Sequence, residues 1–488
     1  MSAGQDLITV PARVLAEPKV FYRNNKSVNV AFGSWNMDKV QFNKPGNLKK
    51  WSWIAIRDAN RPPSHSMQDL DATVARFWQA LSKNGVTAQQ QPLRGREVQM
   101  AYPSDPVLET MFEQASQALD LLLIILPGRD KTDNTELYSY VKTLGDTRYG
   151  IHTICVVGAK FAGGRGEDQY FANVALKFNL KLGGDNQMVD PSRLSFINED
   201  KTMIVGIDVT HPSPGSSDKA PSVAGMVSSR NKHLGQWPGL LSVQKARQEM
   251  VSELCNMLKK FLEDWKTLGK HAHYPENILV YRDGVSEGQY QTVLDEELPL
   301  LRKACAETYP ADLTKSGLPR LSVVIVGKRH HTRFYPTQAK DMDRGGNCKP
   351  GTVVDRGVTE EGFWDFFLQS HAVIQGTGRP AHYVVVLDEI FRDRARKLKQ
   401  KDPFAANELE RVTQALCYTY SRATKAVSIC TPAYHADILC ERARRYMADL
   451  FEGSSDGAST VAGSTTGSAG DPGRLKIHER LEDTMFYI

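Results

Sequence analysis

The sequence lacks a disulfide framework, a membrane-spanning run and a secretory leader. Its seven cysteines are scattered and never stand in a CxxC pair, which argues against both a disulfide scaffold and a zinc site. No apolar run approaches the length of a transmembrane helix, and no basic start precedes an apolar segment at the N-terminus. These absences favour a reducing compartment, so we expect a cytoplasmic protein without a membrane partner.

The chain also lacks a strong charge of one sign. Lys and Arg number 61 against 56 Asp and Glu, a formal net charge of +5. Such a small excess does not by itself predict a nucleic-acid partner, so the placement of individual charges must decide. A length of 488 residues exceeds one ordinary domain and allows about two to four.

What is present is an alternation of apolar runs and helical patterns, which predicts an α/β class. Residues 1–50 are mixed and polar and are interpreted as a linker. In residues 51–190, a buried strand at 121–126, a helix from about Asp133 to Gly145 and a strand at 154–158 form a compact βαβ unit. Such units bind ligands where strands end and helices begin.

Residues 191–488 are predicted to form a second α/β unit, with strands expected at 203–209, 222–229, 277–283, 321–329 and 382–389. Apolar residues from Val251 to Trp265 recur at helical spacing and predict an amphipathic core helix. Residues 453–473 are rich in Gly, Ser and Thr and are expected to be a disordered loop.

Two acids end predicted strands, Asp208 before Thr-His-Pro and Asp283 before Gly-Val-Ser. If the strands are neighbours, the carboxylates repel one another unless a cation intervenes, and oxygen ligands favour Mg²⁺ or Mn²⁺. For any single strand-end Asp, a bond to the following turn is the more common role. Both interpretations stay open at this point.

Five segments resemble signatures of Argonaute PIWI domains: GIDVTHP, YRDGVSEGQ, VGKRHHTRFYP, HAVIQGTGRPAHY and PAYHADILCERARRYM. LGDTRYG and NLKLGGDN are similar to the MID domain of the same eukaryotic family, and the likeness extends to the quelling Argonautes of filamentous fungi. The resemblance implies a Rossmann-like MID domain followed by a ribonuclease H-like PIWI domain. It also implies a part of a longer chain, because the family's N-terminal and PAZ domains are missing.

The resemblance implies small-RNA-guided silencing, in which target RNA paired to a guide RNA is cleaved with two Mg²⁺ or Mn²⁺ ions. Asp208, Asp283 and Asp437 match the metal-binding acids, and Glu249, expected at the start of the amphipathic helix, matches the family's inserted glutamate. Many animal members carry His at the position of Asp437, but Asp suits Mg²⁺ at least as well. His435 is the alternative ligand, which the register disfavours.

The resemblance also implies a pocket for the phosphorylated 5′ end of the guide. Tyr138 and Lys142 stand four residues apart on one predicted helix face, which by itself also fits a solvated face. The family positions that hold the 5′ nucleotide match Tyr138, Lys142, Lys177, Lys181 and Arg442. One position that is usually Gln in animal members is Ile154, which puts one phosphate contact in doubt.

Arg329, Lys425 and Tyr434 match positions that track the guide backbone. His330 and His331 lack a third ligand at metal-site spacing, so packing or phosphate contact is favoured over zinc. The basic run at 392–401 fits a solvated helix face and is left outside the site. Two alternatives stay open: a guide-binding silencing module without cleavage, and a ribonuclease H-like nuclease without a guide.

Overall fold

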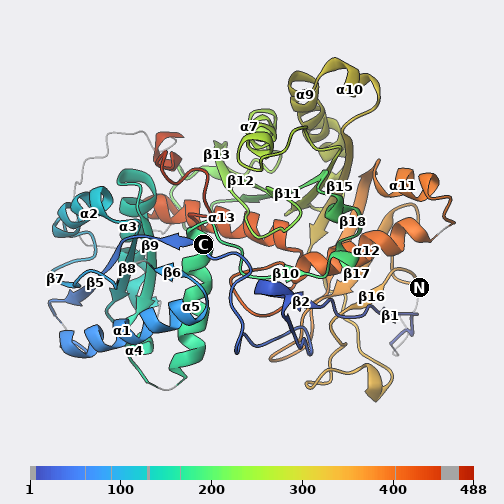
Figure 1. Cartoon of the computed structure of the whole chain (residues 1–488). Coiled ribbons are helices and arrows are strands. Elements are labelled where there is room, and N and C mark those ends of the chain that lie inside the picture. Colours follow the sequence, from blue (N-terminus) through green and yellow to red (C-terminus); the bar gives the residue numbers. More distant parts are fainter. Residues whose placement is uncertain are drawn as a thin grey trace.

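A computed structural model describes residues 7–60, 62–88, 91–128, 132–164, 166–401, 403–451 and 472–488. Two large sheets organise the chain, a four-stranded sheet on the left of Figure 1 and a nine-stranded sheet on the right. Nearly all of the loop predicted at 453–473 lies outside the described residues. No helix in the described ranges is both long and apolar enough to cross a membrane.

The smaller sheet is entirely parallel, in the order β7-β5-β8-β9. Its strands are β5 (Trp51–Asp58), β7 (Arg96–Met100), β8 (Leu121–Leu126) and β9 (His152–Val157). Every residue of β8 is buried, as expected for a parallel strand covered on both faces. The covering helices are α1 (Met67–Lys83) and α5 (Glu167–Lys181) on one face, and α2 (Val107–Ala118) and α3 (Thr135–Thr143) on the other.

Helix α1 illustrates how local sequence sets an element. The Ser66 hydroxyl accepts the backbone N–H of Asp69 at 3.1 Å, while the Asp69 carboxylate accepts the N–H of Ser66. This reciprocal cap satisfies two N–H groups that a helix start otherwise leaves unpaired. Apolar side chains at helical spacing, among them Leu70 and Phe77, then face the sheet.

The larger sheet has the order β1-β16-β17-β18-β15-β14-β11-β12-β13. Three adjacent strands, β11, β14 and β15, are parallel, and the flanking strands are antiparallel. The central strands are β11 (Thr202–Thr210), β12 (Ser222–Ser228), β13 (Gly239–Gln244), β14 (Asn277–Asp283) and β15 (Arg320–Gly327). The outer ones are β16 (Thr352–Val354), β17 (Trp364–Gln369) and β18 (Ala381–Asp388).

Helices cover both faces of this sheet. Alternate residues of β11 point to opposite sides: Val205 packs with α7 (Leu254–Thr267) and α9 (Leu298–Thr308), and Ile204 packs with α12 (Phe404–Cys417) and α13 (Thr431–Tyr446). Helix α13 approaches the sheet closely at Gly206, where a Cβ atom would lie 2.0 Å from the Pro432 carbonyl oxygen. Glycine is therefore required at this contact.

The N-terminal segment forms no sheet of its own. Strand β1 (Arg13–Val14) extends the nine-stranded sheet by pairing with β16, while β2 (Val20–Phe21) lies between β3 (Ser27–Val28) and β10 (Met188–Val189). Residues predicted as a linker thus complete structure made by distant parts of the chain.

Candidate functional site

Asp208 and Asp283 lie at the same edge of the larger sheet. Strands β11 and β14 are parallel neighbours, and the register pairs Ile207 with Arg282, so the two acids follow at the next position on each strand. Asp208 is buried, and the Asp283 carboxylate accepts the backbone N–H of Gly284 at 2.7 Å. The edge where parallel strands end is where such folds collect their functional groups.

Helix α13 brings Asp437 to this edge from the face of the sheet. The charge of Asp437 acts on both Asp208 and Asp283. His435, two residues earlier, is fully buried among the rings of Trp237 and Tyr487, with centroids 6.0 and 5.9 Å away. Neither ring nitrogen of His435 has a hydrogen-bond partner, so this histidine lies in the core and not beside the acids.

All three aspartates are hard to ionise. Burial first, and then the charges of Asp283 and Asp437, raise the pKa of Asp208 well above its usual value. Burial raises the pKa of Asp283 to about 6, and the nearby Asp437 adds to the increase. The pKa of Asp437 is raised by burial and by Glu441. Negative charge at this edge is thus poorly compensated by the protein.

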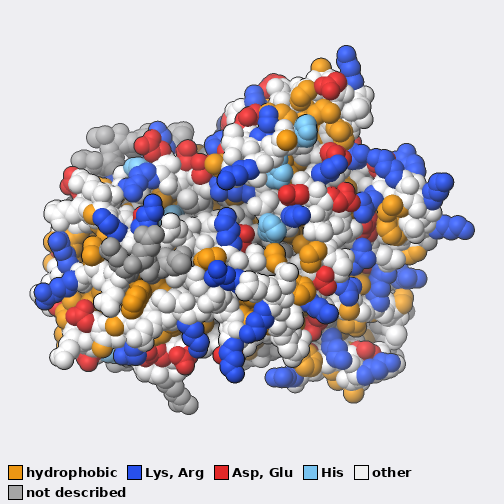
Figure 2. Space-filling model, viewed as in Figure 1, with side chains coloured by type: hydrophobic (Ala, Val, Ile, Leu, Met, Phe, Trp, Pro, Cys, Tyr) orange, Lys and Arg blue, Asp and Glu red, His pale blue; other side chains and the backbone are white. Residues whose placement is uncertain are grey.

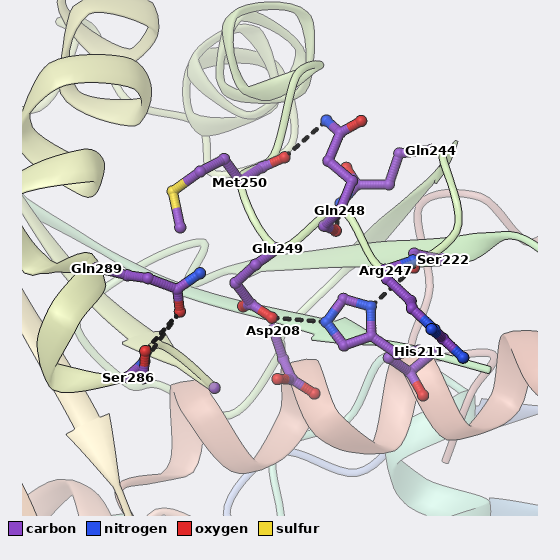
Figure 3. A network of polar contacts seen from close by, with 12 residues as sticks. Asp208, His211, Ser222, Gln244, Arg247, Gln248, Glu249, Met250, Ser286 and Gln289 are labelled. Carbon is purple, nitrogen blue, oxygen red and sulfur yellow. Dashed lines mark hydrogen bonds and ion pairs between the residues drawn. The ribbon is translucent and has the colours of Figure 1, made fainter. Parts of the chain in front are cut away.

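Glu249 completes the group, but not from the element that we predicted. It lies in the loop between β13 and α7, because α7 begins only at Leu254. A Cβ atom placed on Gly284 would lie 3.3 Å from both the Glu249 and the Asp208 carboxylates, so the two acids flank this glycine. The loop, rather than a helix start, positions the glutamate beside Asp208 (Figure 3).

A polar network holds Glu249. Figure 3 shows His211 between Glu249 and Ser222, with each ring nitrogen 2.7 Å from its oxygen partner. The fully buried Arg282 donates to the Glu249 carboxylate at 2.9 Å. Burial opposes ionisation of Glu249, but His211 and Arg282 outweigh it and lower its pKa.

Sequence reasoning assigned no role to His211 or Arg282. A signal was available, since each lies inside a family-like segment, three residues after Asp208 and directly before Asp283. Their partner Glu249 lies far away in sequence, so only the fold reveals the contact.

The acids suit a divalent cation in donor chemistry and in charge. Carboxylate oxygens are the ligands that Mg²⁺ and Mn²⁺ prefer, and a cation would favour the charged forms of the three aspartates, whose pKa values are raised by burial and by neighbouring carboxylates. Among the described residues, however, no three His, Cys, Asp or Glu side chains stand close enough to hold a metal ion. The acids lie near one another but do not form a complete set of metal ligands.

A second cluster, of cations, lies between the two sheets. The Lys142 ammonium is 5.3 Å from the centre of the Tyr138 ring, and Arg442 donates to the Tyr138 hydroxyl at 3.1 Å. Burial raises the pKa of this hydroxyl, but Arg442 and Lys142 outweigh burial and leave it below its usual value. Three of the predicted pocket residues therefore touch one another, although Tyr138 and Arg442 lie in different units of the fold.

Lys142 and Lys181 are almost completely buried. Lys142 donates to the carbonyl and hydroxyl oxygens of Thr153, at 2.8 and 2.7 Å, and Lys181 donates to the Phe486 carbonyl. Burial and the neighbouring Lys142 lower the pKa of Lys181 well below its usual value. An anion beside these side chains would favour their charged forms.

One buried carboxylate, Asp146, balances part of this charge. It accepts from Arg442 at 2.6 Å and from the Tyr446 hydroxyl at 2.8 Å, and Arg442 also donates to the Phe486 and Tyr487 carbonyls. Burial raises the pKa of Asp146, but the surrounding cations, Arg442 first, bring it below the usual value.

The remaining predicted pocket positions differ in their surroundings. Lys177 lies on α5, one turn before Lys181, and is partly exposed. Ile154 packs in the hydrophobic core and is 2% exposed. Its side chain is thus committed to packing.

Arg329 is exposed just beyond β15, and its charge acts on Asp283 and Asp437. Lys425 is also exposed, while the Tyr434 ring packs on Tyr420 at 4.9 Å. Of these three predicted backbone-tracking residues, Arg329 is the one whose charge acts on the pKa values of Asp283 and Asp437 in the described part of the chain.

The basic run at 392–401 lies mainly on α11 (Phe391–Lys397), where Figure 2 shows Lys and Arg side chains gathered at one edge of the molecule. Two of them pair with Asp393, Arg396 at 3.4 Å and Lys397 at 2.8 Å. Strand β18 runs antiparallel to β15 and ends opposite its start. Helix α11 therefore lies at the end of the sheet opposite the acids.

Comparison with known proteins identifies the family. The Piwi domain model matches residues 121–448. Protein argonaute 5 of Arabidopsis thaliana is 36% identical over 512 aligned positions, covering 100% of this chain and 48% of the relative, and Protein argonaute MEL1 of rice is 34% identical, covering 99% and 46%. The chain spans about half the length of these relatives.

Solved structures agree with the fold. The Neurospora crassa QDE-2 MID-PIWI structure has a TM-score of 0.65 at 28% identity, covering 92% of this chain and 100% of that one. Kluyveromyces polysporus Argonaute with a guide RNA has a TM-score of 0.82 at 24% identity, covering 99% and 57%, and at this identity shows the fold alone. The predicted fold class is confirmed: the four-stranded unit is of the MID type, and the nine-stranded unit is a ribonuclease H-like PIWI fold.

The homology to plant argonautes along the whole of this chain and the Piwi match over most of it leave one conclusion: this protein belongs to the Piwi-domain family, as a eukaryotic Argonaute.

Proposed function

We propose that this chain binds the phosphorylated 5′ end of a small guide RNA and cleaves target RNA paired to that guide. The observation that carries the proposal is that one helix, α13, supplies Asp437 to the acids and Arg442 to the cation cluster. A single rigid element thus fixes the distance between an anion-binding pocket and a group of carboxylates.

The cation cluster suits a terminal phosphate. Lys142, Lys181 and Arg442 offer charge-assisted hydrogen bonds, and the Tyr138 ring offers a surface on which a base can stack. Burial, and then the like charge of Lys142, lower the pKa of Lys181, so a phosphate dianion beside it would favour its charged form. An uncharged 5′ hydroxyl would gain far less.

The acids suit phosphodiester hydrolysis. Asp208, Asp283 and Asp437 would hold the divalent cations, which when bound activate water and stabilise the leaving 3′ oxygen. Glu249 would keep its negative charge beside them, because His211 and Arg282 lower its pKa.

Guide binding is tested with one short RNA carrying either a 5′ phosphate or a 5′ hydroxyl. We expect the parent chain to prefer the phosphate by at least about tenfold, a difference of ~1.4 kcal/mol, and Lys142→Met to remove most of that preference. Arg396→Gln, on the distant α11, is the matched control for a lost positive charge. Equal affinity of the parent for both RNAs would exclude the pocket.

Cleavage is tested with guide-loaded protein and a complementary RNA in Mg²⁺. Asp437→Asn should remove cleavage and leave guide binding unchanged. Cleavage by this variant at the parent rate would show that our register for the last acid is wrong.

A silencing module that binds guide RNA without cleaving is the second candidate. It is favoured by one observation, that no three acids in the described part of the chain stand close enough to hold a metal. Phosphate-selective guide binding combined with a failure of Mn²⁺ to bind the parent chain would support this alternative.

A further inference from the structure

A cavity of about 310 Å³ lies where the MID-type unit, the PIWI unit and the C-terminal segment meet. Asp120, His152 and Lys181 line it from the first unit, Arg230 from the second, and Arg480 and Asp483 from the C-terminal segment. Of the predicted guide-pocket residues, only Lys181 reaches this cavity. It is therefore a neighbour of the guide pocket and not the same space.

Three cations line the cavity without an ion pair. Arg230 donates to the Asp483 carbonyl, Arg480 to the Ser116 carbonyl at 2.6 Å, and Lys181 to the Phe486 carbonyl. Within the described residues, no carboxylate forms a salt bridge with any of the three. Lys181 is buried and Arg230 is half-buried, and such cations are ordinarily paired, since carbonyl contacts alone leave much of their charge uncompensated.

Two further groups in the cavity wall have unused hydrogen-bonding capacity. His152 is 7% exposed, and its Nδ1 has no partner. The buried Nε of Arg230 also has none. A buried polar atom without a partner costs free energy, so such atoms mark a place where a ligand completes the bonding.

The two carboxylates in the wall have partners elsewhere. Asp120 accepts the backbone N–H groups of Lys49 and Lys50 at 2.9 Å, and Asp483 accepts from Lys260 at 3.2 Å. Neither carboxylate forms an ion pair with Lys181, Arg230 or Arg480 in the described part of the chain, although the charge of Asp483 acts on Arg230.

We propose that this cavity is a second anion site, which binds a phosphate-class anion and thereby ties the MID-type unit, the PIWI unit and the C-terminal segment together. The chemistry fits two sources, a free polyphosphate or a phosphate group of a bound RNA. The cavity is large enough to admit pyrophosphate, and Arg480, which lines it, is exposed.

Pyrophosphate is the probe, titrated calorimetrically into the 488-residue chain without RNA and then with saturating 5′-phosphorylated RNA. We expect Arg480→Gln to weaken pyrophosphate binding by about tenfold and Arg230→Gln by at least as much. Arg396→Gln serves as the control for a lost surface charge. Pyrophosphate should also raise the Tm of the parent, because it binds only the folded state, and this rise should be lost in Arg480→Gln.

Arg480 is exposed, so its replacement leaves the fold intact even if Arg230→Gln proves unstable. Unchanged pyrophosphate affinity with saturating RNA supports a free anion as ligand. Displacement by RNA, with both ligands weakened in Arg480→Gln, supports an RNA phosphate in the same cavity. The proposal is overturned if pyrophosphate does not bind, or if Lys142→Met abolishes binding while Arg480→Gln leaves it unchanged.

Discussion

The two polar sites of this chain are opposite in charge, and the protein compensates them to different degrees. In the cation cluster, the buried Asp146 and the carbonyls of Phe486 and Tyr487 accept hydrogen bonds from Arg442. At the acid edge, the fully buried Arg282 is bonded to Glu249 and Glu297. The charges of Arg282, Arg329 and Lys328 act on the aspartates, yet burial and neighbouring carboxylates keep the pKa values of all three raised.

The difference indicates how each site depends on its ligand. The cation cluster is largely assembled from its own contacts, so a ligand enters a prepared pocket. The acids carry raised pKa values and need a cation before all of them can ionise together. We expect guide binding to tolerate loss of metal, and metal binding to respond steeply to any change among the acids.

The largest effect is expected at Asp208, the most buried of the three acids. Asp208→Asn removes a ligand and its charge, so Mn²⁺ affinity should fall by at least about 100-fold. Residues that only support metal ligands already cost up to about 100-fold in affinity when they are mutated. A Mn²⁺ titration followed by electron paramagnetic resonance measures the affinity. Guide affinity should stay at the parent value; a parallel loss of guide binding would break the contrast between the sites.

A large effect on folding stability is expected at Arg442. Arg442→Met leaves Asp146 buried without its main partner, and should lower the free energy of unfolding by about 3–5 kcal/mol. Urea unfolding at neutral pH measures the change. Adding Asp146→Asn should restore part of the stability, because the uncompensated charge is then gone; a further loss would contradict this role for Asp146.

The acid edge should also respond to pH. The pKa of Asp283 is about 6 in the folded chain, against its usual value of 3.8. Its proton therefore favours folding, and the stability of the metal-free chain falls as pH rises through about 6. A cation must displace that proton, so Mn²⁺ affinity should rise from about pH 5 to 7 and then level off. Affinity independent of pH across this range would contradict the raised pKa.

The smallest effect is expected at the exposed Arg329. Arg329→Gln should weaken binding of guide–target duplex only slightly and reduce the dependence of log affinity on log salt by about one unit, the value for one lost phosphate contact. Titrations at several salt concentrations measure the slope. Lys425→Gln, a similarly exposed change away from the acids, shows whether the effect is specific to the position.

Many of the strands and helices could be predicted from local sequence patterns. The continuous apolar run of β8 and the helical spacing of α7 identified their elements, because burial dictates residue type directly. The strands β7, β13 and β17 were not predicted; β13 has a half-buried sequence without a clear period. The domain boundaries at 50 and 190 stay predictions.

Within the sites, family-like segments identified the acids and the pocket residues, but not what holds them. Glu249 was expected on a helix, yet an extended loop delivers it, because its partners His211 and Arg282 come from two other strand ends. Asp146 was overlooked because an isolated aspartate in LGDTRYG has no local signature of burial. Contacts between distant segments, unlike periodicity, leave little trace in a single sequence.

The pairing of β1 with β16 has a consequence for the timing of folding. Arg13 and Val14 are made before their partners, Val353 and Thr352, which follow only after more than 300 further residues have been added. Contacts so far apart in sequence carry a high loop-closure cost and tend to form late. During synthesis the nine-stranded sheet therefore has an open edge at β16 until β1 pairs with it, and β1 stays unpaired until β16 has been made. This pairing is the step most in need of chaperone protection.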